Sequence, residues 1–239
     1  MALVEARELR LALGGRTVLD GVSFTLEAGE VVGLLGPNGA GKTTTLGVLS
    51  TLRRPAAGTA VVAGHSVTTA PAAVRGTLGV VPQAVALYPP LTARENLAFF
   101  ARVLGLARAQ VATAITRALA LVGLEDRADD AVATFSGGMQ RRLNLACGLL
   151  HAPRVVLLDE PTVGVDPQSR ERIHDAMRAQ VRRGAAVLYS THYLEEAERV
   201  CDRVVLIDHG RVIAAGTPAS LERGGRSGDR KSTRLNSSH

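Results

Sequence analysis

Nine consecutive residues have the types and the spacing that suit binding of a phosphate chain. They contain the pattern G-x-x-x-x-G-K-[ST] and are Gly36, Pro37, Asn38, Gly39, Ala40, Gly41, Lys42, Thr43 and Thr44. Glycines allow the backbone to curl so that successive N–H groups point inward at an anion. In such a loop Lys42 reaches the β- and γ-phosphates, and the Thr43 hydroxyl is a ligand for Mg²⁺. We therefore predict a nucleoside triphosphate site.

The elements on either side of this loop must position it. Val31–Leu35 is an apolar run typical of a short buried strand, and Thr43–Leu52 predicts a helix with an apolar side at Leu46, Leu49 and Leu52. The N-terminus of that helix adds positive potential at the phosphates. An ordinary strand–turn–helix with a chance lysine is the alternative, and this context disfavours it.

An acidic pair extends the prediction from binding to hydrolysis. Asp159 and Glu160 follow the run Val155–Leu158, which is typical of a strand buried on both faces. Asp159 can hold Mg²⁺ there, and Glu160 can polarise an attacking water. A surface-facing acidic pair explains these two residues equally well when they are taken alone. The phosphate loop favours the functional interpretation.

Short strands are expected in the N-terminal third. Leu3–Leu13 and Gly21–Leu26 are separated by a glycine turn and predict a small antiparallel sheet that leads into the strand at Val31. Another strand pair is expected at Gly58–Val62 and Leu78–Pro82. Gln83 follows the second of these strands directly.

Residues 92–150 contain helical patterns only. Thr92 and Glu95 form a capping box, a second helix is expected at Gln110–Val122 with Gly123 as its stop, and Ser136 can cap a third. The apolar residues of the first helix are Leu97, Phe99, Phe100, Val103 and Leu104. We therefore predict a helical subdomain at about residues 92–150, inserted into an α/β core.

The C-terminal third alternates helices with strands, which indicates an α/β core. The expected elements are helix Gln168–Arg182, strand Ala185–Tyr189, helix Glu195–Val200 and the hairpin strands Val204–Ile207 and Arg211–Ala214.

Six motifs in one order resemble the nucleotide-binding domain of an ATP-binding-cassette (ABC) transporter. They are Walker A at Gly36–Thr43, the Q-loop at Gln83, the signature at Phe135–Gln140, Walker B at Val155–Asp159 with Glu160 after it, the D-loop at Val163–Asp166 and the switch histidine His192. The resemblance covers residues 1 to about 222. Its most specific element is Ser136-Gly137-Gly138. Taken alone, Gln83, Asp166 or His192 would be an ordinary loop or surface residue, and only their order overrules that interpretation.

The resemblance implies a P-loop NTPase (RecA-like) core with an N-terminal antiparallel β-subdomain and an inserted α-helical subdomain. It implies ATP, with Mg²⁺ held by Thr43, Gln83 and Asp159. Two such domains would pair head to tail, and each ATP would lie between Walker A of one copy and the signature of the other. The residues facing that ATP from the second copy would be Ser136, Gly137 and Gly138.

The resemblance also implies a role for each catalytic residue. Glu160 would be the catalytic base, and His192 would contact the γ-phosphate and orient the water. Gln83 would sense Mg²⁺ and that water, Lys42 would hold the phosphates, and Asp166 would link the two sites across the dimer interface.

Leu13 departs from the family pattern. The family usually has an aromatic residue just before the turn at Gly14-Gly15, where its ring stacks on adenine. Stacking should therefore be weaker in this chain, and the preference between ATP and GTP is open. Phe135 at the start of the signature, where leucine is commonest, is a tolerable apolar change.

A separate permease subunit is expected as a partner. No apolar run approaches the roughly 18 residues that a membrane-spanning helix needs, and the N-terminus lacks a secretory signal pattern. The resemblance implies that the permease contacts about Ala84–Phe100, at the cytoplasmic face of the cell membrane. The segments Leu87–Leu97 and Pro161–Pro167 are similar to those of multidrug and antibiotic exporters, more than to those of sugar or metal importers.

The alternatives are the ATPase of an importer, a soluble ABC ATPase and a non-hydrolysing structural subunit. Ribosome-acting ABC ATPases carry two cassettes, and chromosome-acting ones need long coiled coils between Walker A and the signature. This chain has one cassette and no such coiled coil. The residues that argue against a non-hydrolysing subunit are Lys42, Asp159, Glu160 and His192.

The C-terminal end is set apart from the fold expectation. Asp229–His239 resembles a translated sequencing adapter, and residues 223–239 are expected to be a disordered tail that replaces the native C-terminal region. This end contributes to the net charge of +6. The rest of the chain has no dense Lys/Arg block and few aromatic side chains, so a nucleic-acid partner is disfavoured.

Overall fold

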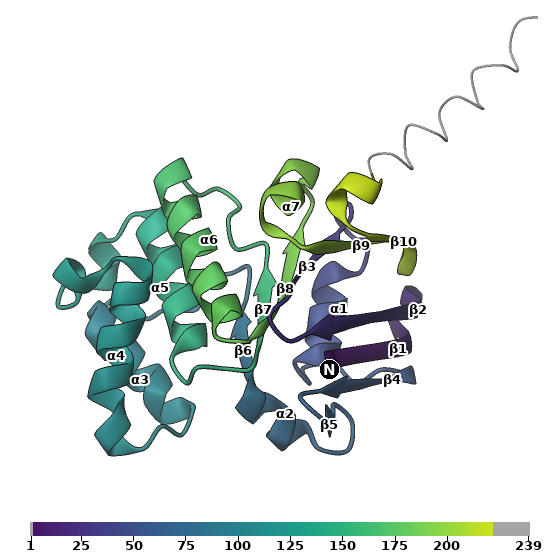
Figure 1. Cartoon of the computed structure of the whole chain (residues 1–239). Helices are drawn as coiled ribbons and strands as arrows, with labels where there is room; N and C mark the ends of the chain where they lie inside the picture. Colours follow the sequence, from purple (N-terminus) through teal and green to yellow (C-terminus); the bar gives the residue numbers. More distant parts are fainter. Residues whose placement is uncertain (1, 222–239) are drawn as a thin grey trace, which may run out of the picture.

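A computed structural model describes residues 2–221 (Figure 1). The expected tail at residues 223–239 lies outside this part of the chain. The strands are β1 (Ala2–Leu13), β2 (Arg16–Glu27), β3 (Val31–Leu35), β4 (Ala57–Val62), β5 (His65–Ser66), β6 (Leu78–Val81), β7 (Val155–Asp159), β8 (Ala186–Thr191), β9 (Arg203–Asp208) and β10 (Arg211–Gly216). The α-helices are α1 (Lys42–Leu49), α2 (Pro71–Thr77), α3 (Ala93–Val103), α4 (Arg108–Val122), α5 (Gly137–Leu149), α6 (Pro167–Arg182) and α7 (Leu194–Val200).

The strands form two sheets, as expected for the predicted P-loop NTPase fold. An antiparallel sheet has the order β2-β1-β4-β5, and the larger sheet has the order β10-β9-β3-β8-β7-β6. In the larger sheet β9, β3, β8, β7 and β6 run parallel, and only β10 is antiparallel to its neighbour. Among the helices within residues 2–221, none has the length and apolar character needed to cross a bilayer.

The central strands β3, β7 and β8 of the larger sheet are buried on both faces, so successive residues of these strands enter different cores. In β3, Val32 and Leu34 pack with α1 and the antiparallel sheet, whereas Val31 and Leu35 pack on the side of α5, α6 and α7. This explains why the central strands are continuous apolar runs without polar alternation. Figure 1 shows α1 between the two sheets.

Helices α3, α4 and α5 occupy residues 93–149, and no strand interrupts this stretch, all of which is described. The capping box is confirmed, because Glu95 N donates to Thr92 Oγ1 and Thr92 N donates to the Glu95 carboxylate. Gly123 ends α4 at φ +62°. Side chains of all three helices share one core, so the signature at the start of α5 is carried on a packed helical layer.

Two sequence expectations are wrong. β4 and β6 do not pair, because β4 pairs with β1 in the antiparallel sheet and β6 lies parallel to β7. Leu52 is not on a buried helix face: α1 ends at Leu49, Thr51 adopts φ +64°, and Leu52 is 79% exposed. Of the apolar residues named for α3, Leu97 is buried, whereas Phe99 and Val103 are exposed.

Parallel strands bring the predicted motifs to one edge. The neighbours β3, β8, β7 and β6 all end at the same edge of the sheet. The phosphate loop follows β3, His192 follows β8, Asp159 ends β7, and Gln83 lies just beyond β6. Ligands of open α/β sheets bind at the carboxyl ends of the strands, so this edge is the expected site.

Candidate functional site

The phosphate loop leaves β3 under tight steric constraint. A Cβ on Gly36 would overlap the carbonyl oxygen of Ile207, and Gly41 has φ +109° where it caps α1. Both positions therefore require glycine. Lys42 starts the helix with its side chain buried, and its Nζ donates to the carbonyls of Gly36 (2.8 Å) and Pro37 (3.2 Å).

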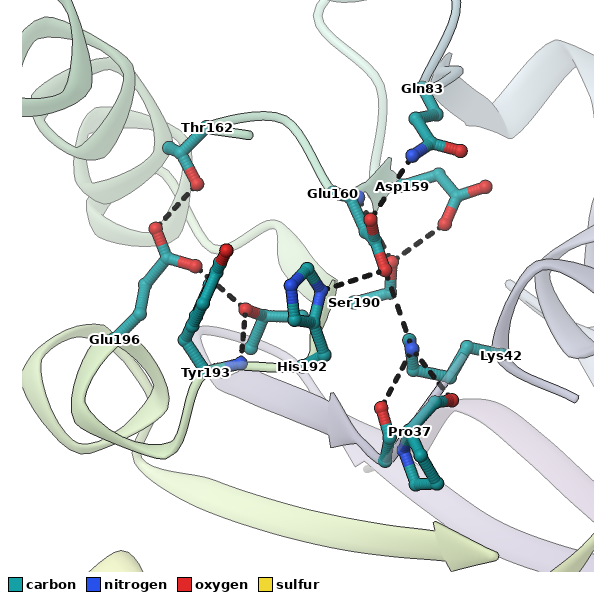
Figure 2. Close-up of polar contacts among 12 residues, drawn as sticks. Pro37, Lys42, Gln83, Asp159, Glu160, Thr162, Ser190, His192, Tyr193 and Glu196 are labelled. Atoms are coloured by element: carbon teal, nitrogen blue, oxygen red, sulfur yellow. Dashed lines mark hydrogen bonds and ion pairs between the residues drawn. The ribbon is translucent and has the colours of Figure 1, made fainter. Parts of the chain in front are cut away.

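Three of the predicted site residues meet at the carboxylate of Glu160 (Figure 2). Lys42 Nζ lies 3.4 Å from Glu160 Oε1, and His192 Nδ1 lies 3.3 Å from the same oxygen. Gln83 Nε2 donates to Glu160 Oε2 at 3.1 Å. The Glu160 side chain is only 10% exposed. Residues from the ends of β3, β6, β7 and β8 thus surround one buried carboxylate.

The backbone of Glu160 is strained. Its φ is +45°, a conformation that costs roughly 1–2 kcal/mol for a residue with a side chain. Its amide is held by the carbonyl of Ser190 (3.2 Å) and by Ser190 Oγ (3.0 Å). Strained residues that the surrounding structure holds in place cluster at functional sites. In this conformation the Glu160 carboxylate contacts Lys42 and His192.

Asp159 ends β7 with one oxygen engaged. Ser190 Oγ donates to Asp159 Oδ1 at 2.7 Å, and no residue of the described chain donates to Oδ2. The Thr43 side chain is exposed at the start of α1. A hydroxyl, a carboxylate and the Gln83 amide oxygen are the hard oxygen ligands that Mg²⁺ prefers, so the donor set fits this cation.

A cavity of about 470 Å³ joins the phosphate loop to this acidic centre. It is mainly polar, and its wall contains residues from all four strand ends: Asn38, Gly39, Gly41, Lys42, Thr43, Thr44, Gln83, Glu160 and His192. Nine of the predicted binding and catalytic residues therefore line one cavity, and Asp159 precedes Glu160 beside it.

Other predicted site residues lie outside this cavity. Ser136 caps α5 by accepting from Met139 N at 3.2 Å, and Ser136 and Gly137 are exposed. Gly138 is buried against the D-loop, where Asp166 caps α6 by accepting from Ser169 N at 2.8 Å. That amide lowers the pKa of Asp166 below its usual range. Within this chain the signature therefore packs on the D-loop and does not line the phosphate cavity.

Leu13 also lies apart from the phosphate cavity. It ends β1, pairs with Arg16 across the glycine turn and is partly exposed. The one residue of β2 that reaches the cavity is the aliphatic Val18.

The sequence interpretation missed three residues that hold the site. Ser190 bridges Asp159 and the Glu160 amide, and it could have been noticed as a polar residue in an apolar strand before His192. Asn144 accepts from Ala86 N and donates to the carbonyl of Pro82, and Arg141 donates to the carbonyl of Gln83. Both fasten the Q-loop to α5. Asn144 is detectable as a polar residue on a helix face that is otherwise apolar.

The comparisons with known proteins agree with this geometry. The family model described as ABC transporter matches residues 19–163. The linearmycin resistance ATP-binding protein LnrL of Bacillus subtilis is 43% identical over 219 residues, which is 92% of this chain and 70% of that protein. The Nod factor export ATP-binding protein I of Burkholderia lata is 46% identical over 222 residues, 92% of this chain and 73% of that protein.

A solved structure is similar over nearly the whole chain. The ATP-binding subunit of an ABC transporter superposes with a TM-score of 0.84 and 34% identity, covering 94% of this chain and 93% of that one. The match of the family model, these relatives and the arrangement at Glu160 give one answer: the chain belongs to the ABC transporter family, as an ATP-binding subunit with the fold of its ATPases.

Proposed function

We propose that this chain hydrolyses ATP at Glu160 and that the hydrolysis drives export of drugs or other small or lipophilic molecules through a separate permease. The observation that carries the proposal is the convergence of Lys42, Gln83 and His192 on one buried carboxylate beside the phosphate loop. The order of the strands in the sheet produces this convergence.

In this proposal Glu160 and its contacts His192 and Lys42 each have a chemical function. Glu160 accepts a proton from the attacking water, whose oxygen bonds to the γ-phosphorus while the bond to ADP breaks. His192 orients the water, and Lys42 offsets negative charge on the phosphates. Positioning of this kind is the main source of catalysis in phosphoryl transfer.

Magnesium is the cation that this donor set fits. Within residues 2–221 no group of three or more His, Cys, Asp and Glu side chains could hold a metal. Phosphate oxygens of ATP would complete the coordination together with protein oxygens, as is usual for Mg²⁺. Thr43, Asp159 and Gln83 would supply the protein ligands. The cation would neutralise charge on the β- and γ-phosphate oxygens.

The proposed site is completed by a second copy of the chain. Ser136 and Gly137 are exposed at a helix N-terminus, which is a suitable anion site, but they lie outside the phosphate cavity of their own chain. A head-to-tail dimer would place them against the ATP of the partner.

The names of two relatives support export as the direction of transport. One is named for linearmycin resistance and another for Nod factor export. Co-expression with a candidate permease, in cells loaded with a fluorescent lipophilic compound, tests the direction. We expect lower accumulation than with a Lys42→Ala control. Raised accumulation would identify an importer, and unchanged accumulation with every compound of this class would contradict lipophilic export.

Leu13→Tyr is expected to tighten ATP binding. A tyrosine ring at the end of β1 would offer the adenine a stacking face that Leu13 and Val18 do not, worth roughly 1–3 kcal/mol, or at least about fivefold in Kd. Leu13→Met is the matched control, because it keeps the volume without an aromatic face. Titration of both variants with ATP and GTP measures the effect. Equal affinities in the two variants would remove the stacking argument.

A second hollow, mostly apolar and about 300 Å³ in volume, lies beside the Q-loop. It includes Ala86 and Phe100 from the expected permease contact and extends to Leu52, Val103 and Leu104. The chain has only seven Tyr and Phe residues, and three of them gather next to this groove: Tyr88, Phe99 and Phe100. Exposed apolar and aromatic patches mark protein interfaces. We infer that the permease docks in this groove.

Val103→Asp is expected to uncouple the chain from its permease. Val103 is 66% exposed on the groove wall, so a carboxylate there would be buried unpaired on docking, while the isolated fold would tolerate it. Ile213→Asp, at a 59% exposed position on β10, is the matched control. We expect Val103→Asp alone to lose co-purification with the permease, with the ATPase rate of the isolated chain within about twofold of the parent. Equal co-purification of both variants would place the permease elsewhere.

A further inference from the structure

A buried carboxylate behind the catalytic centre joins two catalytic segments. Glu196 on α7 has a side chain that is 9% exposed. Thr162 Oγ1 donates to its Oε1, and Thr191 Oγ1 donates to its Oε2 at 2.7 Å. Both threonines are almost fully buried. Figure 2 shows Glu196 facing Thr162, on the far side of His192 from Lys42.

The two threonines flank the residues proposed for catalysis. Thr162 follows Glu160 by two residues, and Thr191 immediately precedes His192. Tyr193 N donates to Thr191 Oγ1 at 3.1 Å, which closes the turn that carries His192. One side chain on α7 therefore anchors both partners of the 3.3 Å contact between Glu160 and His192.

The negative charge of Glu196 fixes which group donates in each of these hydrogen bonds. Burial alone would raise the pKa of Glu196, but the neighbouring His174 and the hydroxyls of Thr162, Thr191 and Tyr189 lower it to about 2. An ionised carboxylate only accepts hydrogen bonds, so both threonine hydroxyls must point their protons at it. The Tyr189 hydroxyl, 2.9 Å from Thr162 Oγ1, is then the donor in that pair.

We propose that Glu196 is a positioning residue for ATP hydrolysis: its two oxygens fix the segment after Walker B and the switch segment relative to each other, and so hold Glu160 and His192 in register. This inference rests on the catalytic roles proposed above for those two residues. Glu196 itself does not line the phosphate cavity, and neither do Thr162 and Thr191. We therefore expect substitution of Glu196 to lower the rate of ATP turnover and to leave the affinity for ATP unchanged.

Glu196→Gln tests the proposal with little change in shape. The amide can accept from only one threonine with its oxygen, so one charged hydrogen bond is lost. We expect kcat to fall about tenfold or more, with the Kd for ATP within about twofold of the parent. Glu195→Gln is the matched control, since Glu195 is the exposed neighbour on the same helix, and it should keep the parental kcat.

A second pair separates positioning from general stability. Thr191→Val removes the donor hydroxyl at nearly constant volume, and Thr191→Ser restores it. We expect Thr191→Val to lower kcat and Thr191→Ser to rescue it, with Glu196→Gln adding little to Thr191→Val. Parental kcat in Glu196→Gln and Thr191→Val would overturn the inference. The inference would also be overturned if Thr191→Ser had the same low kcat as Thr191→Val. It would equally be overturned if the fall in kcat came with an equal loss of ATP affinity.

Glu160→Gln, measured in parallel, distinguishes this inference from the proposed function. If Glu160→Gln hydrolyses ATP at the parental rate, the proposed catalytic role of Glu160 is wrong and the inference falls with it. If Glu160→Gln is inactive while Glu196→Gln is fully active, the inference alone fails.

Discussion

Glu160→Gln is expected to lower the ATPase rate by about 10²- to 10⁴-fold, the usual contribution of a general base. The amide keeps the size of the side chain and can still accept from Gln83, but it cannot take a proton from water. Binding of ATP should persist, because the phosphate loop and Lys42 are unchanged. Loss of the negative charge 3.4 Å from Lys42 Nζ should also favour the phosphate-bound form.

Phosphate release and light scattering with ATP measure these two effects. We expect Glu160→Gln to accumulate as an ATP-bound dimer with little turnover. Lys42→Ala is the contrasting variant: it should lose ATP binding and therefore also the dimer. A Glu160→Gln protein that turns over at the parental rate would exclude Glu160 as the base and shift attention to His192.

The composition of the site was predictable, because its residues lie at the ends of strands that the sequence marks clearly. Val155–Leu158 is apolar throughout and is followed by two acidic residues, so both the strand and the position of its carboxyl end could be predicted. The parallel arrangement of β3, β8, β7 and β6 then brings the carboxyl ends of these strands together. Local patterns gave less indication of the supports of the site. Ser190 stands out only as a polar residue in an apolar strand, and both Ser190 and Glu196 act on residues about 30 positions earlier in the chain.

The two errors have different physical origins. β6 was expected to pair with a strand close in sequence, but it lies beside β7, and a pairing across the intervening helices leaves no local signal. Leu52 fits a helical spacing, yet the backbone turns at Thr51 and leaves it on the surface. The fold leaves Leu52 beside the apolar groove next to the Q-loop, which Val103 also lines.

The two signature glycines differ in a way that allows the proposed dimer to be tested. At Gly138 an added Cβ would overlap Asp166 Oδ2 and Ser169 Oγ of the same chain. At Gly137 an added Cβ meets nothing within 4 Å, and the backbone there is helical. Gly138 is therefore required by the fold of the single chain, whereas no contact within the described chain explains why residue 137 is a glycine.

Gly137→Ala is accordingly expected to leave the fold intact and to weaken the dimer. A methyl group at this exposed helix start would occupy space that the partner's ATP must enter, so we expect the ATP-dependent dimer of the Glu160→Gln protein to weaken roughly tenfold or more. The thermal midpoint of the single chain should not fall. Gly138→Ala should instead destabilise the single chain by about 1–3 kcal/mol. If Gly137→Ala dimerises with parental affinity, the signature does not close over the partner's nucleotide, and the site at Glu160 is complete within one chain.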